Sequence, residues 1–208
     1  RTGRPVSCLT DGRPRAYTSR LMRCALRMAF SIALWLATSA GGALAQIPDQ
    51  AQSAFAEGRY LTAALLAEAD GSAESLAFAA RARIADAITR PNGMCFDCLL
   101  DAEATAKAAI GRDPNLAEAH VQLAIAIGFR GRLVSTFEAQ SEGLAERGRA
   151  AIDRALELDP ANSWARASLG GWHLEIVHRA GKLLAAVFYD ASEDEGLRNF
   201  RAALAGDP

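Results

Sequence analysis

Residues 148–170 read GRAAIDRALELDPANSWARASLG. Gly148, Ile152 and Ala155 lie 12, 8 and 5 positions before the proline of this stretch, a spacing that places them on one face of a helix. The dipeptide Asp159-Pro160 ends that helix, because proline disfavours helical geometry in the residue before it. A second run rich in alanine follows directly. The stretch therefore predicts two helices that approach closely and are joined by a short turn.

The same pattern occurs three times along the chain. Asp-Pro dipeptides stand at 113–114, 159–160 and 207–208, and small or apolar residues precede each proline at the same three positions. An internal repeat of this kind predicts an array of helix pairs in which each unit packs on the next. The equivalent residues are Ala102, Ala106 and Ala109, then Gly148, Ile152 and Ala155, then Gly196, Phe200 and Ala203.

We expect four units, at about 49–71, 73–113, 115–160 and 162–208. Successive prolines are 46 and 48 residues apart, and the extra length falls between the two helices of a unit. The segments 131–134 (GRLV) and 181–184 (GKLL) match, so these connectors belong to the repeat. Ser192 with Glu195 predicts a capping box at the last helix. The predicted helices cover about 49–58, 60–70, 73–89, 99–111, 114–131, a segment ending at 158, and 160–181.

From Ala51 to Pro208 the chain resembles tetratricopeptide repeat proteins. The resemblance rests on the small-x3-apolar-x2-Ala-x4-Pro second helices, on the pairs Leu123-Ala124 and Leu169-Gly170 in the first helices, and on Gly131 at the end of one of them. It implies an all-α fold, an α-solenoid of antiparallel helix pairs, and the spacing of the prolines adds elongated helix-helix connectors. The unit exceeds the family's length of ~34 residues. His120 and Arg166 stand where the family usually has a bulky aromatic residue.

The resemblance also implies a function, the binding of a protein or peptide in a groove formed by the first helices, without chemistry on the partner. We therefore expect neither catalytic residues nor a cofactor. The implied partner-binding residues are Glu118, Gln122, Ile125, Phe129, Trp164, Ser168, Gly171 and Glu175.

The N-terminal sequence predicts export. Residues 22–45 have a basic start, an apolar stretch and small residues before a cleavage site between Ala45 and Gln46, as in a secretory signal peptide. We expect residues 1–21 to be an upstream extension of no function, the bacterial periplasm to be the compartment, and no stable membrane insertion after cleavage. At the other end, Pro208 stands where a further helix would begin, so we expect a capping helix to be missing.

The charge distribution disfavours nucleic acid as a partner. Residues 1–45 hold seven of the 23 basic residues and one of the 24 acidic residues, so residues 46–208 carry 16 basic and 23 acidic side chains, a net charge of −7. No basic stripe is present to follow a phosphate backbone. His173, Glu175 and His178 do not have metal-ligand spacing, and we expect the acidic run at Asp190 to Glu195 to be a helix start.

Cys95 and Cys98 are the only cysteines after residue 45, and three interpretations remain open for them. A structural disulfide fits an exported protein. A redox pair is the second, because a helix N-terminus lowers a thiol pKa, although Asp97 opposes this. Metal binding is the third, and it would need further ligands.

Two functional alternatives to the protein-binding groove follow. One is a thiol-disulfide helper that uses Cys95 and Cys98. The other is a carrier of a small ligand, for example in a transport system, with Trp164, Trp172 and their aromatic neighbours forming a pocket. The apolar run 183–189 either packs under a neighbouring unit or forms a second contact surface.

Overall fold

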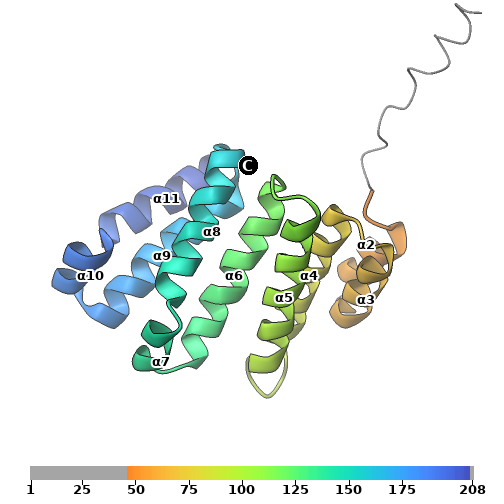
Figure 1. The fold of residues 1–208 in the computed structure, drawn as a ribbon, viewed down its shortest axis with the longest axis horizontal. Helices are drawn as coiled ribbons and strands as arrows, with labels where there is room; N and C mark the ends of the chain where they lie inside the picture. The colour runs from red at the N-terminus through yellow and green to blue at the C-terminus, as the bar shows by residue number, and fades with distance from the viewer. Residues whose placement is uncertain (1–45, 207–208) are drawn as a thin grey trace, which may run out of the picture. The chain divides into compact units, whose positions relative to one another are not determined.

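A computed structural model describes residues 46–206 (Figure 1). The predicted upstream extension, the signal peptide with Ala45, and the last Asp-Pro dipeptide lie outside the described residues. Within residues 46–206 there are ten helices and no strand, so the predicted all-α class is confirmed. No helix in this range is both long and apolar enough to cross a membrane.

The helices pack as pairs that follow one another along the chain (Figure 1). α2 packs on α3, α4 on α5, α6 on α8 and α9 on α11, while α4, α6 and α9 also contact one another in succession. The elements are α2 (Asp49–Ala56), α3 (Tyr60–Asp70), α4 (Ala73–Ile88), α5 (Phe96–Arg112), α6 (Ala117–Leu133), α7 (Thr136–Ser141), α8 (Leu144–Leu158), α9 (Ser163–Ala180), α10 (Lys182–Tyr189) and α11 (Glu193–Gly206).

Residues at equivalent positions of the sequence repeat pack in equivalent places. The alanine five positions before each described Asp-Pro proline is fully buried between the first helix of its own unit and the first helix of the next. Such small residues let three helices meet at one point with little space between their backbones. The two equivalent clusters are Ala77, Ala109 and Ala119, and Val121, Ala155 and Ala165.

Both described Asp-Pro dipeptides end their helices with the same geometry. Asp113 and Asp159 have extended backbones with φ of −139°. Each carboxylate accepts a hydrogen bond from the backbone N–H two residues on, at 2.8 Å from Asn115 and 3.1 Å from Ala161. An aspartate that bonds its own turn while proline blocks the helix is a strong stop signal.

His120 and Arg166 occupy equivalent places in successive units. The Nε2 of His120 lies 3.0 Å from the carbonyl oxygen of Pro114, and a guanidinium nitrogen of Arg166 donates to the carbonyl oxygen of Pro160 at 2.7 Å. Both polar side chains thus reach back six residues to the turn that precedes their helix. The contact gives each of these polar side chains a hydrogen-bond partner in its own unit.

Two of the lengthened connectors contain helices of their own. α7 lies between α6 and α8, and α10 lies between α9 and α11. The prediction that Gly131 ends its helix is wrong, because α6 continues through it to Leu133. Gly181 does end α9, with a φ of 78° that favours glycine. The two first helices are therefore nearly equal, at 17 and 18 residues.

The predicted capping box at the start of α11 is half formed. The Oγ of Ser192 accepts a hydrogen bond from the N–H of Glu195 at 3.2 Å. The N–H of Ser192 donates to Nδ1 of His173 at 3.4 Å, and the Glu195 carboxylate pairs with Arg198. In a full capping box the N–H of Ser192 would bond the side chain of Glu195. Here that N–H attaches α11 to α9 instead.

A buried carboxylate joins three helices near the middle of the described residues. Glu103 on α5 is 4% exposed and accepts hydrogen bonds from Arg130 on α6 at 3.1 Å and from Arg147 on α8. Arg130 is 3% exposed and also pairs with Glu142 at 2.5 Å. Because these charges are buried, each needs the other, and removing one partner leaves an uncompensated charge.

We expect Glu103→Gln to destabilise the protein by about 3 kcal/mol, because Arg130 loses its main buried counter-charge. Urea unfolding of the full chain measures this. Glu157→Gln, which removes one partner of a solvent-exposed pair with Arg154, is the control and should change stability by less than about 0.5 kcal/mol. Equal effects of the two substitutions would contradict a structural role for Glu103.

The same carboxylate predicts a pH dependence. Burial acts to raise the pKa of Glu103, but the hydrogen bond from Lys107 and the charges of Arg130 and Arg147 outweigh it and leave the pKa lowered. Its contribution to stability is present above the unfolded-state pKa of about 4.3 and is lost as the pH falls through the lower folded pKa. Between about pH 6 and pH 3 the wild-type protein should lose more stability than Glu103→Gln. Parallel pH profiles would show that Glu103 does not contribute.

Two glycines bring the backbones of α9 and α11 into contact. A Cβ on Gly170 would lie 2.9 Å from the carbonyl oxygen of Gly196 and 3.1 Å from the ring of Phe200. A Cβ on Gly196 would lie 2.9 Å from the side chain of Leu174. No side chain fits at this crossing. The two helices therefore meet at positions where the repeat has small residues.

Gly170→Ala should destabilise the protein by about 1–3 kcal/mol through overpacking. Its neighbour provides a matched control, since a Cβ on Gly171 would meet only Phe200 at 4.0 Å. Gly171→Ala should stabilise by about 0.5–1 kcal/mol, as alanine does in a helix interior. Thermal unfolding midpoints measure both, and shifts of the same sign would refute the close crossing.

Candidate binding cleft

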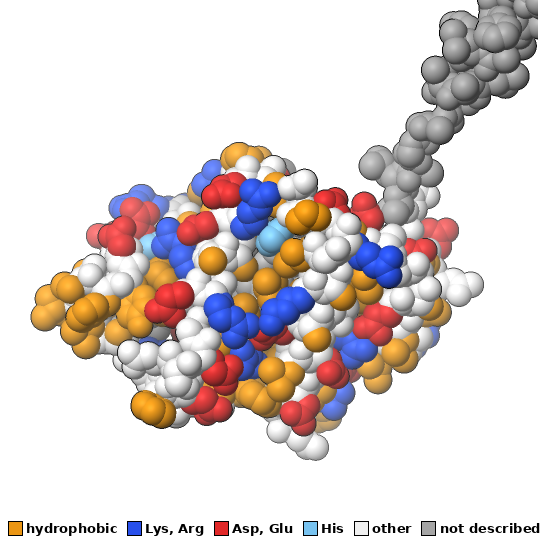
Figure 2. Space-filling view, viewed as in Figure 1, with side chains coloured by type: hydrophobic (Ala, Val, Ile, Leu, Met, Phe, Trp, Pro, Cys, Tyr) orange, Lys and Arg blue, Asp and Glu red, His pale blue; other side chains and the backbone are white. Residues whose placement is uncertain are grey.

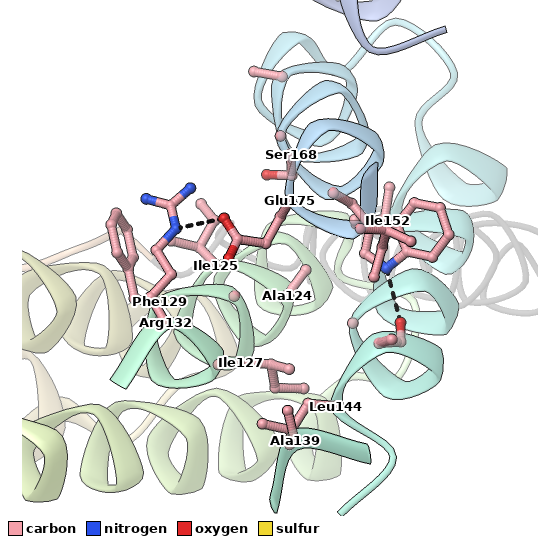
Figure 3. Close-up of a pocket in the computed structure, with 18 of the residues that line it drawn as sticks. Ala124, Ile125, Ile127, Phe129, Arg132, Ala139, Leu144, Ile152, Ser168 and Glu175 are labelled. Carbon is pink, nitrogen blue, oxygen red and sulfur yellow. Dashed lines mark hydrogen bonds and ion pairs between the residues drawn. The ribbon is translucent and has the colours of Figure 1, made fainter. Parts of the chain in front are cut away.

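An apolar cleft of about 350 Å³ lies between α6, α8 and α9 (Figure 3). Ile125 and Phe129 of α6 line one side of it, and Ile152 of α8 lies deeper. Trp164 and Trp172 come from α9. Its lining is mostly apolar, so water inside it has few hydrogen-bonding partners.

The cleft exists because small residues on α9 face α6. Ala167, Ser168 and Gly171 all line it, and none of them is long enough to fill the space between the two helices. Trp172, which also lines the cleft, is held by a hydrogen bond from its Nε1 to the carbonyl oxygen of Ala145 at 2.9 Å (Figure 3). The guanidinium of Arg149 lies 5.1 Å from the Trp172 ring centroid. The wall is therefore fixed while the space in front of it stays open.

One end of the cleft carries charge. Glu175 of α9 accepts a hydrogen bond from Nε of Arg132 at 3.2 Å and from Nε of Arg179 at 2.7 Å. Arg132 lies over the ring of Phe129, with 5.3 Å to the centroid. A second, polar hollow adjoins this end and adds Thr136 and the exposed His178. Two guanidinium groups and one carboxylate give this rim an excess of one positive charge.

Trp164 marks the other end of the cleft. It is 54% exposed, and the guanidinium of Arg81 on α4 lies 5.7 Å from its ring centroid. The same guanidinium lies 5.3 Å from the centroid of Phe55. A large exposed aromatic residue beside an apolar cleft is typical of binding surfaces.

The structure brings six of the eight predicted groove residues together. These six line the cleft, and two others, Glu118 and Gln122, do not. Gln122 is 5% exposed and donates to the carboxylate of Glu118 at 2.7 Å, so the two residues satisfy each other one turn before the cleft begins. The six are Ile125, Phe129, Trp164, Ser168, Gly171 and Glu175.

Sequence reasoning missed the part of the cleft contributed by the second helix and by the two arginines of the charged rim. Leu144 and Gly148 of α8 line it, as do Arg132 and Arg179. The repeat pattern identifies Gly148 as a residue of the packed helix face. Its place in the lining of the cleft depends on how α9 packs against α8. Arg132 and Arg179 are 47 positions apart, and nothing in their local sequence indicates that they share Glu175.

Cys95 and Cys98 form a disulfide at the start of α5, with 5.3 Å between their Cα atoms. The Sγ of Cys95 accepts a hydrogen bond from the N–H of Cys98 at 3.2 Å, and the N–H of Cys95 donates to Ala87 at 3.0 Å. The bridge thus caps α5 and attaches its loop to α4. Neither cysteine lines the cleft.

The other residues considered for chemistry have structural surroundings. Burial, followed by the charge of Arg149, lowers the pKa of His173, which favours a neutral ring that accepts the Ser192 N–H. Glu193 to Glu195 form the first turn of α11, as expected from the helix dipole, and Asp190 ends α10 with a φ of 51°. Among residues 46–206 no group of histidine, cysteine and acidic side chains is arranged to hold a metal ion.

No protein-family model matches this chain, and no curated protein matches it. The candidate site therefore stands on its geometry: a half-open apolar cleft with an exposed tryptophan at one end and a singly positive rim at the other.

Proposed function

We propose that this chain is a non-catalytic binding scaffold, a tetratricopeptide-like α-solenoid whose first helices α2, α4, α6 and α9 form the groove. Support comes from the Asp-Pro turns that repeat with the same hydrogen bonds. Further support comes from the two equivalent clusters around Ala109 and Ala155, which are 46 residues apart. These units differ from shorter helix-pair units in their lengthened connectors, which contain helices of their own.

The cleft between α6, α8 and α9 carries the proposal. It offers depth for an apolar side chain and a large aromatic surface in Trp164, the combination that dominates interface energies. In this proposal the partner is a protein or peptide that places an apolar group in the cleft. Binding involves shape and polar complementarity, and no bond of the partner changes.

The proposal includes the periplasm as the compartment, on the signal peptide predicted over residues 22–45. The Cys95–Cys98 disulfide is compatible with that oxidising compartment.

A small-ligand carrier is the second candidate, and the size of the cleft favours it. A volume of about 350 Å³ falls within the range of roughly 300–1,000 Å³ that small-molecule pockets occupy. The two candidates share the cleft and differ in whether the bound apolar group belongs to a macromolecule.

Filling the cleft tests the proposed function. Ser168→Phe puts a ring into the open space, whereas Ala150→Phe adds the same ring on the exposed side of α8. A partner captured by the full chain should bind Ser168→Phe at least about tenfold more weakly, a loss of about 1.4 kcal/mol, and should bind Ala150→Phe normally. Calorimetric titration measures both, with circular dichroism to confirm that each variant is folded.

If Ser168→Phe binds the partner as well as the wild-type protein, the cleft is not the binding site and the proposal is wrong.

A further inference from the structure

The apolar cleft and the polar hollow beside it adjoin at a shared rim, and their linings differ in chemistry. They share the three rim residues Arg132, Glu175 and Arg179. On one side of this rim the lining is mostly carbon, and on the other it is Thr136, His178 and the charged groups. A ligand that fills both parts must be apolar along most of its length and polar at one end.

The charge of the rim specifies that polar end. Glu175 already accepts hydrogen bonds from both arginines, so its charge is satisfied within the protein. Arg132 uses only Nε for this contact, which leaves the two terminal nitrogens of its guanidinium group. Among the described residues those two nitrogens have no hydrogen-bond partner. A guanidinium edge that is open in this way matches the two oxygens of a carboxylate.

One ligand carboxylate would also balance the rim. Arg132 and Arg179 together exceed Glu175 by one positive charge. The Nη1 of Arg179 lies 3.4 Å from the carbonyl oxygen of Val134, which holds that side chain beside the rim. A cationic head group would meet two guanidinium groups and a carboxylate that is already paired, so the rim selects against it.

The apolar part of the cleft has the length of an alkyl chain. The cleft runs along α9 from Trp164 to Glu175, 11 residues or about 16 Å of helix. Each methylene that moves from water into such a space raises affinity about fourfold.

We propose that the cleft binds an amphipathic monocarboxylate, with an alkyl chain between α6 and α9 and its carboxylate at Arg132 and Arg179. This inference rests on the proposed function only in placing binding in the cleft. It departs from the protein or peptide partner, follows the small-ligand candidate, and names the ligand as a free fatty-acid-like molecule.

Three probes with one chain and different head groups test the charge requirement: decanoate and decyltrimethylammonium below their micelle concentrations, and 1-decanol below its solubility limit. Calorimetric titration of the full chain should show decanoate binding about tenfold more tightly than decanol, because a charge-assisted hydrogen bond is added. The decyltrimethylammonium cation should bind least. Equal affinities for the three head groups would overturn the inference.

Substitutions at the rim should act in opposite directions. Arg132→Gln should abolish the preference for decanoate over decanol. Glu175→Gln raises the rim charge from one to two and should strengthen decanoate binding several-fold while leaving decanol unchanged. A gain of this kind cannot come from misfolding. Arg154→Gln, a change of the same type on α8 outside the cleft, should have no effect. A preference that survives Arg132→Gln and Arg179→Gln would refute the assigned head-group site.

The experiment separates this inference from the proposed function. If decanoate does not bind but a partner protein is still lost on Ser168→Phe, the inference is overturned and the proposed function stands. If an acidic, apolar peptide binds and decanoate does not, the occupant is a peptide and the inference is overturned. If neither decanoate nor a partner responds to Ser168→Phe, both are wrong.

Discussion

The close approach of helices at small residues is the constraint on which this structure depends. Alanine supplies most of the buried apolar residues, and at the crossing of α9 and α11 even alanine is too large. A core of small side chains gains less from burial per residue than a core of leucine or phenylalanine, so it must gain through close backbone packing. The addition of one methyl group at such a crossing is therefore enough to change stability.

Buried charge supplements this packing between units. Glu103, Arg130 and Arg147 come from three helices of two successive pairs, and the three groups satisfy one another. A second pairing, Arg83 with Glu68 at 2.5 and 2.9 Å, joins α4 to α3 nearer the N-terminal end of the described residues. Ion pairs of this kind favour one arrangement of neighbouring helices, because another arrangement would bury each charge without its partner.

The cleft is the place where close packing is interrupted. α6 and α9 contact each other less extensively than α4 and α6 do, and small residues on α9 leave the space open. Large exposed apolar side chains also occur on the connector helices, where Phe137 of α7 is 81% exposed and Phe188 of α10 is 72% exposed. Figure 2 shows hydrophobic side chains gathered over α10, so the apolar run predicted at 183–189 stays largely uncovered in the described part of the chain.

The sequence by itself determined the local structure. Asp-Pro dipeptides, small residues at helical spacing and the paired cysteines act through neighbouring residues, so the helix pairs, their ends and the Cys95–Cys98 bridge could be predicted. The prediction failed at Gly131, which was expected to end its helix. α6 continues through this glycine, whose open side lies next to Leu144.

Tertiary structure alone decided the shape of the candidate site and the pairing of its charged rim. Six groove residues could be placed from helical periodicity and the repeat resemblance, but Gln122 turned out to be buried against Glu118. The charged rim could not be predicted, since Arg132 and Arg179 meet at Glu175 only after α9 has packed beside α6. Local patterns encode which face of a helix is buried, whereas the distance between two first helices, and hence the cleft, depends on every side chain packed between them.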